Sequence, residues 1–233
     1  RLWAVADGMG GQAGGDVASR LVMDSLAELA PTLGGIASAP DLHEEERATD
    51  RLTTMAEQAH ASILTHAAQH PPLYGMGTTL VMAHLLPLPK PRLLVLNVGD
   101  SRAYLVRAGT LTQLTRDHTL IEEYVRDGRL TPTQAACHPN RHVLTRAMGL
   151  APHLESDLFF FDLLDGDLLL LCSDGLTKML TDERILQTVR PHRHIPSLAT
   201  QALIHTALDA GGIDNVTVVA CTITEIPDQA NIH

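Results

Sequence analysis

The chain has 233 residues, of which 45% are hydrophobic and 3% aromatic, and its formal net charge at pH 7 is −10. This length and apolar content are enough for one domain with a substantial core. The negative charge and the few aromatic side chains argue against a surface for nucleic acids, and no apolar stretch is long enough to span a bilayer.

The first third of the chain predicts one strand followed by two long helices. Residues 2–6 are a short apolar run of the kind that forms a buried strand. Residues 16–29 and 49–69 carry apolar side chains at helical spacing, and a Gly/Pro/Ser-rich loop at residues 31–40 separates them. The run Glu44-Glu45-Glu46 is predicted to be solvated surface.

The centre of the chain predicts strands and then a helical insertion. Four Leu/Val-rich runs divided by turn residues predict an antiparallel meander, at residues 78–86, 92–98, 102–107 and 111–114. Two short helices are predicted at residues 118–127 and 131–138, with Thr131 as the N-cap of the second and Pro132 in its first turn.

The last third predicts two strands at residues 154–161 and 167–172, helices at 181–189 and 196–210, and a Thr/Val-rich strand at 215–224. Helices and strands do not alternate as they do in a doubly wound parallel sheet. We therefore expect the α+β class, with two antiparallel sheets packed together and helices outside them.

The three cysteines, Cys137, Cys172 and Cys221, are far apart and lack the spacing of zinc ligands. Cys172 and Cys221 lie in apolar runs, which favours inert burial. With no signal-peptide pattern, these residues indicate a soluble, cytoplasmic protein. The sequence opens at Arg1 directly into a predicted strand, as expected of a fragment.

Three aspartates stand beside glycine at predicted strand ends, namely Asp7 before Gly8, Asp174 before Gly175, and Asp214 after Gly211-Gly212-Ile213. One Asp-Gly pair alone is typical of a turn. Three such strand ends that are neighbours would bring the carboxylates together, and a divalent cation usually relieves their repulsion. Oxygen ligands without His or Cys at metal-ligand spacing favour Mg²⁺ or Mn²⁺ over Zn²⁺.

Motifs for other chemistries are not found in the sequence. None of the 13 histidines forms an i, i+4 pair with an acid on a clear helical face, as a zinc peptidase would require. The sequence has neither a Gly-x-Ser-x-Gly elbow nor a Walker loop, so a covalent serine or P-loop mechanism is disfavoured.

Six blocks closely resemble the metal-dependent protein serine/threonine phosphatases, the PPM or type 2C family, in its bacterial form. They occur in the family's order: VADGMGG at 5–11, GMGTT at 75–79, GDSR at 99–102, RDHT at 116–119, CSDGL at 172–176 and DNVT at 214–217. The resemblance covers nearly the whole chain. It implies a four-layer α-β-β-α sandwich of two antiparallel sheets flanked by helices, forming a single domain over residues 1–233, with metals at one edge of the sheets.

The same resemblance implies a core site for two ions, Mn²⁺ or Mg²⁺. Asp7 matches the carboxylate that bridges the two metal ions, and the backbone carbonyl of Gly8 completes the second. Asp174 and Asp214 match the remaining ligands of the first ion. Asn215 is expected to orient Asp214.

An outer, third metal site is implied beside the core site. Asp117 matches a ligand of this weaker site, which shares Asp174. Asp100 is an alternative ligand there, or else caps the turn at Gly99. Residues 118–146 resemble a flap beside the cleft that influences substrate choice, and the alternative is a rigid helical cover.

The activity implied is hydrolysis of phosphoserine and phosphothreonine in proteins, by in-line attack of a metal-bridging water or hydroxide. Asp7, Asp174 and Asp214 are the implied catalytic residues, and Thr78 and Thr79 are expected to support the site from below. The implied partners are phosphorylated proteins, with a serine/threonine kinase and its substrates in bacterial signalling. The alternatives are a noncatalytic phosphatase-like binding module and a hydrolase of small phosphoesters.

Two departures from the family pattern bear on the mechanism. The family's N-terminal hairpin, with its phosphate-gripping arginine and an acid near the second metal, is expected to be missing. Met9 stands where many eukaryotic relatives have a histidine that is proposed as general acid. Protonation of the leaving oxygen then falls to metal-bound water or to another residue, for which His118 is a candidate.

Overall fold

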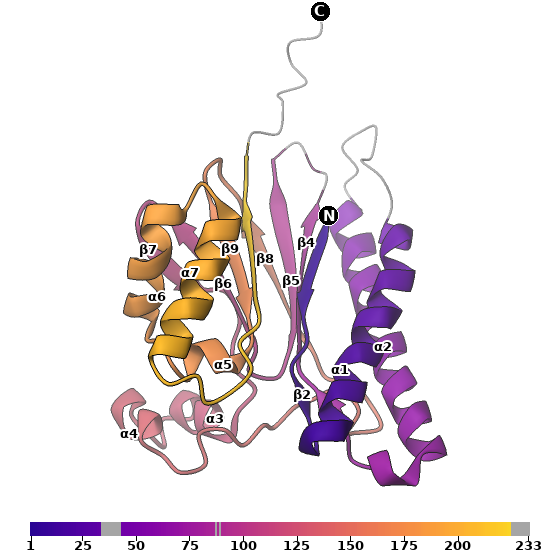
Figure 1. Cartoon of the computed structure of the whole chain (residues 1–233). Helices are drawn as coiled ribbons and strands as arrows, with labels where there is room; N and C mark the ends of the chain where they lie inside the picture. Colours follow the sequence, from indigo (N-terminus) through magenta and orange to yellow (C-terminus); the bar gives the residue numbers. More distant parts are fainter. Residues whose placement is uncertain (34–42, 87, 89, 225–233) are drawn as a thin grey trace, which may run out of the picture.

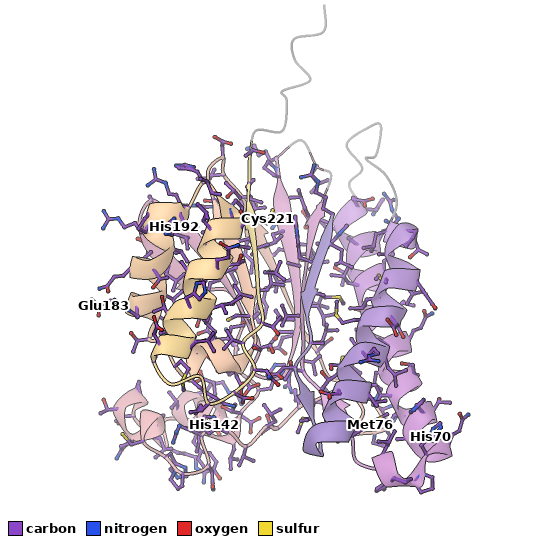
Figure 2. All side chains as sticks on the ribbon, viewed as in Figure 1. His70, Met76, His142, Glu183, His192 and Cys221 are labelled. Carbon is purple, nitrogen blue, oxygen red and sulfur yellow. The ribbon has the colours of Figure 1, made fainter. Side chains whose placement is uncertain are left out.

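The computed structural model describes residues 1–33, 43–86, 88 and 90–224. Two four-stranded antiparallel sheets face each other, and helices cover the outer face of each (Figure 1). This arrangement confirms the predicted α+β class and the α-β-β-α layering. Side chains fill the spaces between the layers (Figure 2). The buried apolar side chains form three clusters, one between the sheets and one under each group of helices.

The first sheet has the strand order β1-β4-β5-β8. Its strands are β1 (Leu2–Val5), β4 (Leu80–Leu86), β5 (Arg92–Val98) and β8 (Asp157–Asp162). Its outer face carries α1 (Gly11–Leu29) and α2 (Glu44–Gln69), each followed by a short 3-10 turn, Ala30–Leu33 and Pro71–Leu73. Strand β4 alternates as a strand must: Met82 packs toward the helices, and Val81 packs toward the other sheet.

The second sheet has the strand order β10-β9-β6-β7. Its strands are β6 (Arg102–Arg107), β7 (Thr110–Gln113), β9 (Leu168–Cys172) and β10 (Val218–Thr222). The helices that follow β9 are α5 (Asp174–Thr177), α6 (Asp182–Val189), with the 3-10 turn Arg190–His192, and α7 (Pro196–Asp209). Strand β9 is an unbroken apolar run because both of its faces are covered, Leu169 by the first sheet and Leu170 by the helices.

Two smaller parts lie at one end of the sandwich, the lower end in Figure 1. One is the ribbon of β2 (Gly8–Met9) and β3 (Gly77–Thr78). The other is the predicted flap, with α3 (Leu120–Arg126) and α4 (Pro132–Ala136). Thr131 is the N-cap of α4, as predicted, and it forms a capping box with Gln134. Backbone hydrogen bonds from Leu120 to Val143 (2.9 Å) and from Thr145 to His118 (2.8 Å) close its base.

The prediction of one meander is wrong, because its four strands belong to two sheets. Strands β4 and β5 form a hairpin in the first sheet, and β6 and β7 form a hairpin in the second. Residues 99–101 carry the chain from one sheet to the other. Gly99 allows this sharp passage, since its φ is +104° and a Cβ atom there would lie 2.7 Å from the Thr79 side chain.

Several element boundaries also differ from those predicted. Helix α1 begins at Gly11, helix α2 begins at Glu44, and the last strand begins only at Val218. Glu44 is 5% exposed rather than solvated, because it lies in the first turn of α2 and pairs with Arg47 and Arg51. Residues 34–40 of the predicted loop lie outside the described residues.

Cys172 is buried, Cys221 is partly buried and Cys137 is exposed, and all three are free thiols. Among the described helices, none combines the length and apolar content that a membrane crossing needs.

The layer between the sheets predicts the effect of one substitution. Leu171 is fully buried there, so Leu171→Ala is expected to lower the free energy of unfolding by about 2–5 kcal/mol in urea titrations. Leu208→Ala makes the same change at a residue that is 53% exposed, and it is expected to cost less than about 1 kcal/mol. Equal losses in the two variants would contradict this packing.

Candidate metal centre

Four aspartates converge at the end of the sandwich where β2 and the flap lie. Asp7 lies between β1 and β2, Asp100 between β5 and β6, and Asp174 is the first residue of α5. Asp214 lies in the loop before β10, not at the strand end as predicted. The structure nevertheless brings the four together. They lie close enough for the charges of the other three carboxylates to raise the pKa of Asp7.

Hydrogen bonds to its backbone fix the position of Asp7. Its amide donates to Oγ1 of Thr79 (3.1 Å), and its carbonyl accepts from the Thr79 amide and from Oγ1 of Thr78, both at 2.9 Å. Thr79 Oγ1 also contacts Oγ of Ser101 at 2.7 Å, which links this segment to the residue after Asp100. The two threonines therefore hold the Asp7 backbone, in line with their predicted supporting role.

Gly8 meets α1 at its backbone. A Cβ atom on Gly8 would lie 2.1 Å from the carbonyl oxygen of Gly15, so only glycine fits this approach. Gly8 is itself exposed. Its backbone is therefore accessible at the edge where the carboxylates meet.

The loop that carries Asp214 is pinned to the start of α5. Oγ of Ser173 donates to the carbonyl of Asn215 (3.2 Å) and accepts from the amide of Thr217 (3.0 Å). A Cβ atom on Gly175 would lie 2.1 Å from the Asn215 carbonyl oxygen, so the loop passes directly over this glycine. Asn215 does orient Asp214, through its backbone amide, which donates to Oδ1 at 2.9 Å.

The carboxylates are costly to ionise together. Burial, followed by the charges of Asp174 and Asp214, raises the pKa of Asp7 to about 7. Burial, followed by the charges of Asp174 and Asp117, raises the pKa of Asp100 to about 7.

Lys178 is a residue of this site that the sequence analysis missed. Its Nζ lies 2.7 Å from Oδ2 of Asp174 and 2.7 Å from Oδ2 of Asp214. The hydrogen bond from Lys178 is the main cause that lowers the pKa of Asp214. The spacing of Asp174 and Lys178, one helical turn apart, was the available sequence signal. In the part of the chain that the structure describes, no three Asp, Glu, His or Cys side chains are set for an ion as they stand.

Asp117, predicted for the outer site, is engaged elsewhere. Arg102 holds it with Nε 2.9 Å from Oδ1 and Nη2 2.7 Å from Oδ2, and Gln113 donates to Oδ1 at 3.0 Å. Asp117 lies near enough to Asp100 for its charge to raise the pKa of that carboxyl. Of the two aspartates predicted for the outer site, Asp117 is therefore already held by Arg102 and Gln113.

His118, considered above as a proton donor, is 6% exposed. Its Nδ1 accepts from the Gly99 amide at 3.1 Å, and its Nε2 lies 3.3 Å from Oδ2 of Asp157. Both ring nitrogens therefore join the flap base to the sheet edge. This placement does not favour proton transfer to a leaving group.

Comparison with known proteins shows which family the chain belongs to. The family model described as protein phosphatase 2C matches residues 1–208. The chain belongs to the protein phosphatase 2C family. Serine/threonine protein phosphatase PstP of Mycobacterium tuberculosis is 40% identical over 230 residues, which is 97% of this chain and 41% of PstP. The chain thus spans less than half the length of that relative.

Other relatives and solved structures of this family agree. Serine/threonine phosphatase stp of Listeria welshimeri is 36% identical, over 92% of this chain and 81% of its own length. The crystal structure of PstP/Ppp from Mycobacterium tuberculosis matches with a TM-score of 0.81 at 37% identity, covering 97% of this chain and 89% of that one. A PstP catalytic domain in complex with 2 manganese ions matches with a TM-score of 0.78 at 38% identity, covering 97% and 88% of the two chains.

The donor set of this phosphatase 2C chain suits a hard divalent ion. Its side-chain groups are carboxylate oxygens, which Mg²⁺ and Mn²⁺ prefer. Oδ1 of Asp174 is buried and has no hydrogen-bond partner. A buried carboxylate oxygen without a donor is unfavourable unless a cation meets it, so the residues fit the expected metal.

The raised pKa of Asp7 predicts how the metal-free protein responds to pH. Its ordinary value is 3.8 and its value in the fold is about 7, so its stabilising contribution is complete below about pH 4 and is lost as pH rises through 7. Asp7→Asn removes the buried charge. In EDTA at pH 8 it is expected to raise the free energy of unfolding by about 1–3 kcal/mol, after allowance for screening, and by little at pH 4.

Urea titrations at several pH values measure this difference. Asp16→Asn makes the same change at an exposed position of α1 and serves as the control. An Asp7→Asn protein that is no more stable than wild type at pH 8 would show that the carboxylates do not repel one another as described.

Proposed function

We propose that the chain is a Mn²⁺- or Mg²⁺-dependent phosphatase that hydrolyses phosphoserine and phosphothreonine in proteins. The observation that carries the proposal is the convergence of Asp7, Asp174 and Asp214 at one edge, with a buried Asp174 oxygen that lacks a partner. The membership of the protein phosphatase 2C family supports the substrate class.

We propose two ions at the core, held by Asp7, Asp174, Asp214 and the backbone carbonyl of Gly8. When bound, such ions activate water and neutralise charge on the phosphoryl oxygens. The PstP domain in complex with 2 manganese ions supports this number. For a third ion, Asp100 is the better candidate, since both Asp117 oxygens are already used by Arg102.

The chain's own residues keep the reacting edge fixed. The Thr78 and Thr79 hydroxyls hold the Asp7 backbone, which fixes the point from which its carboxylate reaches the site. The nearby hydroxyls of Ser101 and Ser173 are buried and hydrogen-bonded inward. This placement favours hydrolysis without a serine intermediate.

The partners we propose are phosphorylated proteins, including a serine/threonine kinase and its substrates. By opposing such a kinase, the protein would take part in bacterial signalling. We propose that it acts in the cytoplasm. The flap at residues 118–146 borders the carboxylate edge and is the part we propose to influence substrate choice (Figure 1).

The direct test is release of phosphate from a phosphothreonine peptide in the presence of Mn²⁺. Asp174→Asn is expected to lower kcat/KM by at least about 100-fold, because it removes one ligand charge from the core. Asp165→Asn, an exposed position in the β8–β9 turn, is the matched control and is expected to keep wild-type activity.

The outcomes separate the proposed function from its alternatives. Faster hydrolysis of small phosphoesters than of phosphopeptides would favour a small-molecule hydrolase. Phosphopeptide binding without turnover, unchanged by Asp174→Asn, would favour a noncatalytic binding module.

A further inference from the structure

The cation nearest to the candidate metal ligands belongs to the protein itself. Nζ of Lys178 lies 2.7 Å from one oxygen of Asp174 and 2.7 Å from one oxygen of Asp214. These two residues are the proposed side-chain ligands that the first ion would share with Asp7. The ammonium therefore joins the same pair of carboxylates that a divalent ion would join.

This ammonium keeps its charge. Two carboxylate oxygens lie at hydrogen-bond distance from its Nζ, and two anions beside one ammonium favour its charged form. The Lys178 side chain is 19% exposed and that of Asp174 is 17% exposed, so water screens the pair only in part. Arg102, the other strong cation of this edge, is bound to Asp117.

Lys178 and its two carboxylate partners lie near the flap. Lys178 is the C-cap of the short helix α5, so its backbone belongs to neither sheet. His142 of the flap lies within range of the charges of Lys178, Asp174 and Asp214 (Figure 2 labels His142). The flexible lysine side chain can therefore change its conformation without any shift of the sheets.

We propose that Lys178 is a built-in counter-ion that joins Asp174 and Asp214 in the metal-free protein and must leave when a divalent ion binds there. The proposal rests on the metal ligands of the proposed function. Its consequences are opposite in the two states: Lys178 stabilises the metal-free fold, and it weakens the binding of the first ion. Lys178 thereby sets the metal concentration at which the site fills.

Calorimetric titration of the metal-free protein with Mn²⁺ alone tests the affinity. Lys178→Met keeps the length of the stem and removes the charge, and it is expected to bind Mn²⁺ about tenfold more tightly, as for an ion pair between the exposed and the buried class. Lys90→Met is the matched control, because Lys90 is exposed and is the only other lysine of the sequence. Equal affinity in wild type and Lys178→Met would overturn the proposal.

Thermal unfolding separates this role from a merely structural one. In EDTA, Lys178→Met is expected to unfold at a lower temperature than wild type, because two carboxylates lose their counter-ion. In saturating Mn²⁺ that difference is expected to disappear, because Lys178 no longer joins the two carboxylates in the wild-type protein. A deficit of equal size with and without Mn²⁺ would contradict the proposal.

Amine labelling of the wild-type protein gives a third measurement, which holds even if Lys178→Met fails to fold. Reductive methylation followed by mass spectrometry is expected to modify Lys178 slowly in EDTA and at least about fivefold faster in Mn²⁺, with Lys90 unchanged. Labelling of Lys178 that does not respond to Mn²⁺ would overturn the proposal. Asp174→Asn tells the two hypotheses apart: if it binds Mn²⁺ as wild type does, the proposed metal site itself is wrong.

Discussion

Four aspartate carboxylates lie at one end of the two sheets, where each is close enough to oppose the ionisation of a neighbour. Side chains free to turn would move apart, so the surrounding backbone has to hold them. Thr78 and Thr79 fix the backbone at Asp7, and Ser173 fixes the loop of Asp214. The stability given up by gathering like charges is what makes the edge attractive to a cation.

The layering explains why the carboxylates meet at this end. The chain changes sheets at residues 99–101, and strand β9 of the second sheet ends beside the same place. Gly99, Gly8 and Gly175 each let two backbone segments approach more closely than any side chain would permit. The glycines next to the acids therefore do more than form turns, since each sets the distance between two segments on its own side of the sandwich.

Much of this could be predicted from the sequence, because local patterns carry it. Helix periodicity found α2 and α7, and the repeated Asp-Gly setting found Asp7 and Asp174. The sheet to which each strand belongs could not be predicted. The sequence of a strand buried on both faces is a continuous apolar run, whether the next strand pairs with it or belongs to the other sheet. The contact of Lys178 with Asp214 was also out of reach, since it depends on a loop distant in sequence that Ser173 and Gly175 hold in place.

The order in which the chain is made gives this edge another property. Asp7 comes from the loop after the first strand, and Asp214 precedes the last strand, β10. Within the described residues, strand β10 pairs with β9 alone and lies at the edge of its sheet. A ribosome-bound chain could fold the first sheet once β8 has emerged, yet it would lack one of the gathered acids until the loop before β10 has also been made. Occupancy of the edge by a metal would thus require that segments of both sheets have already been assembled.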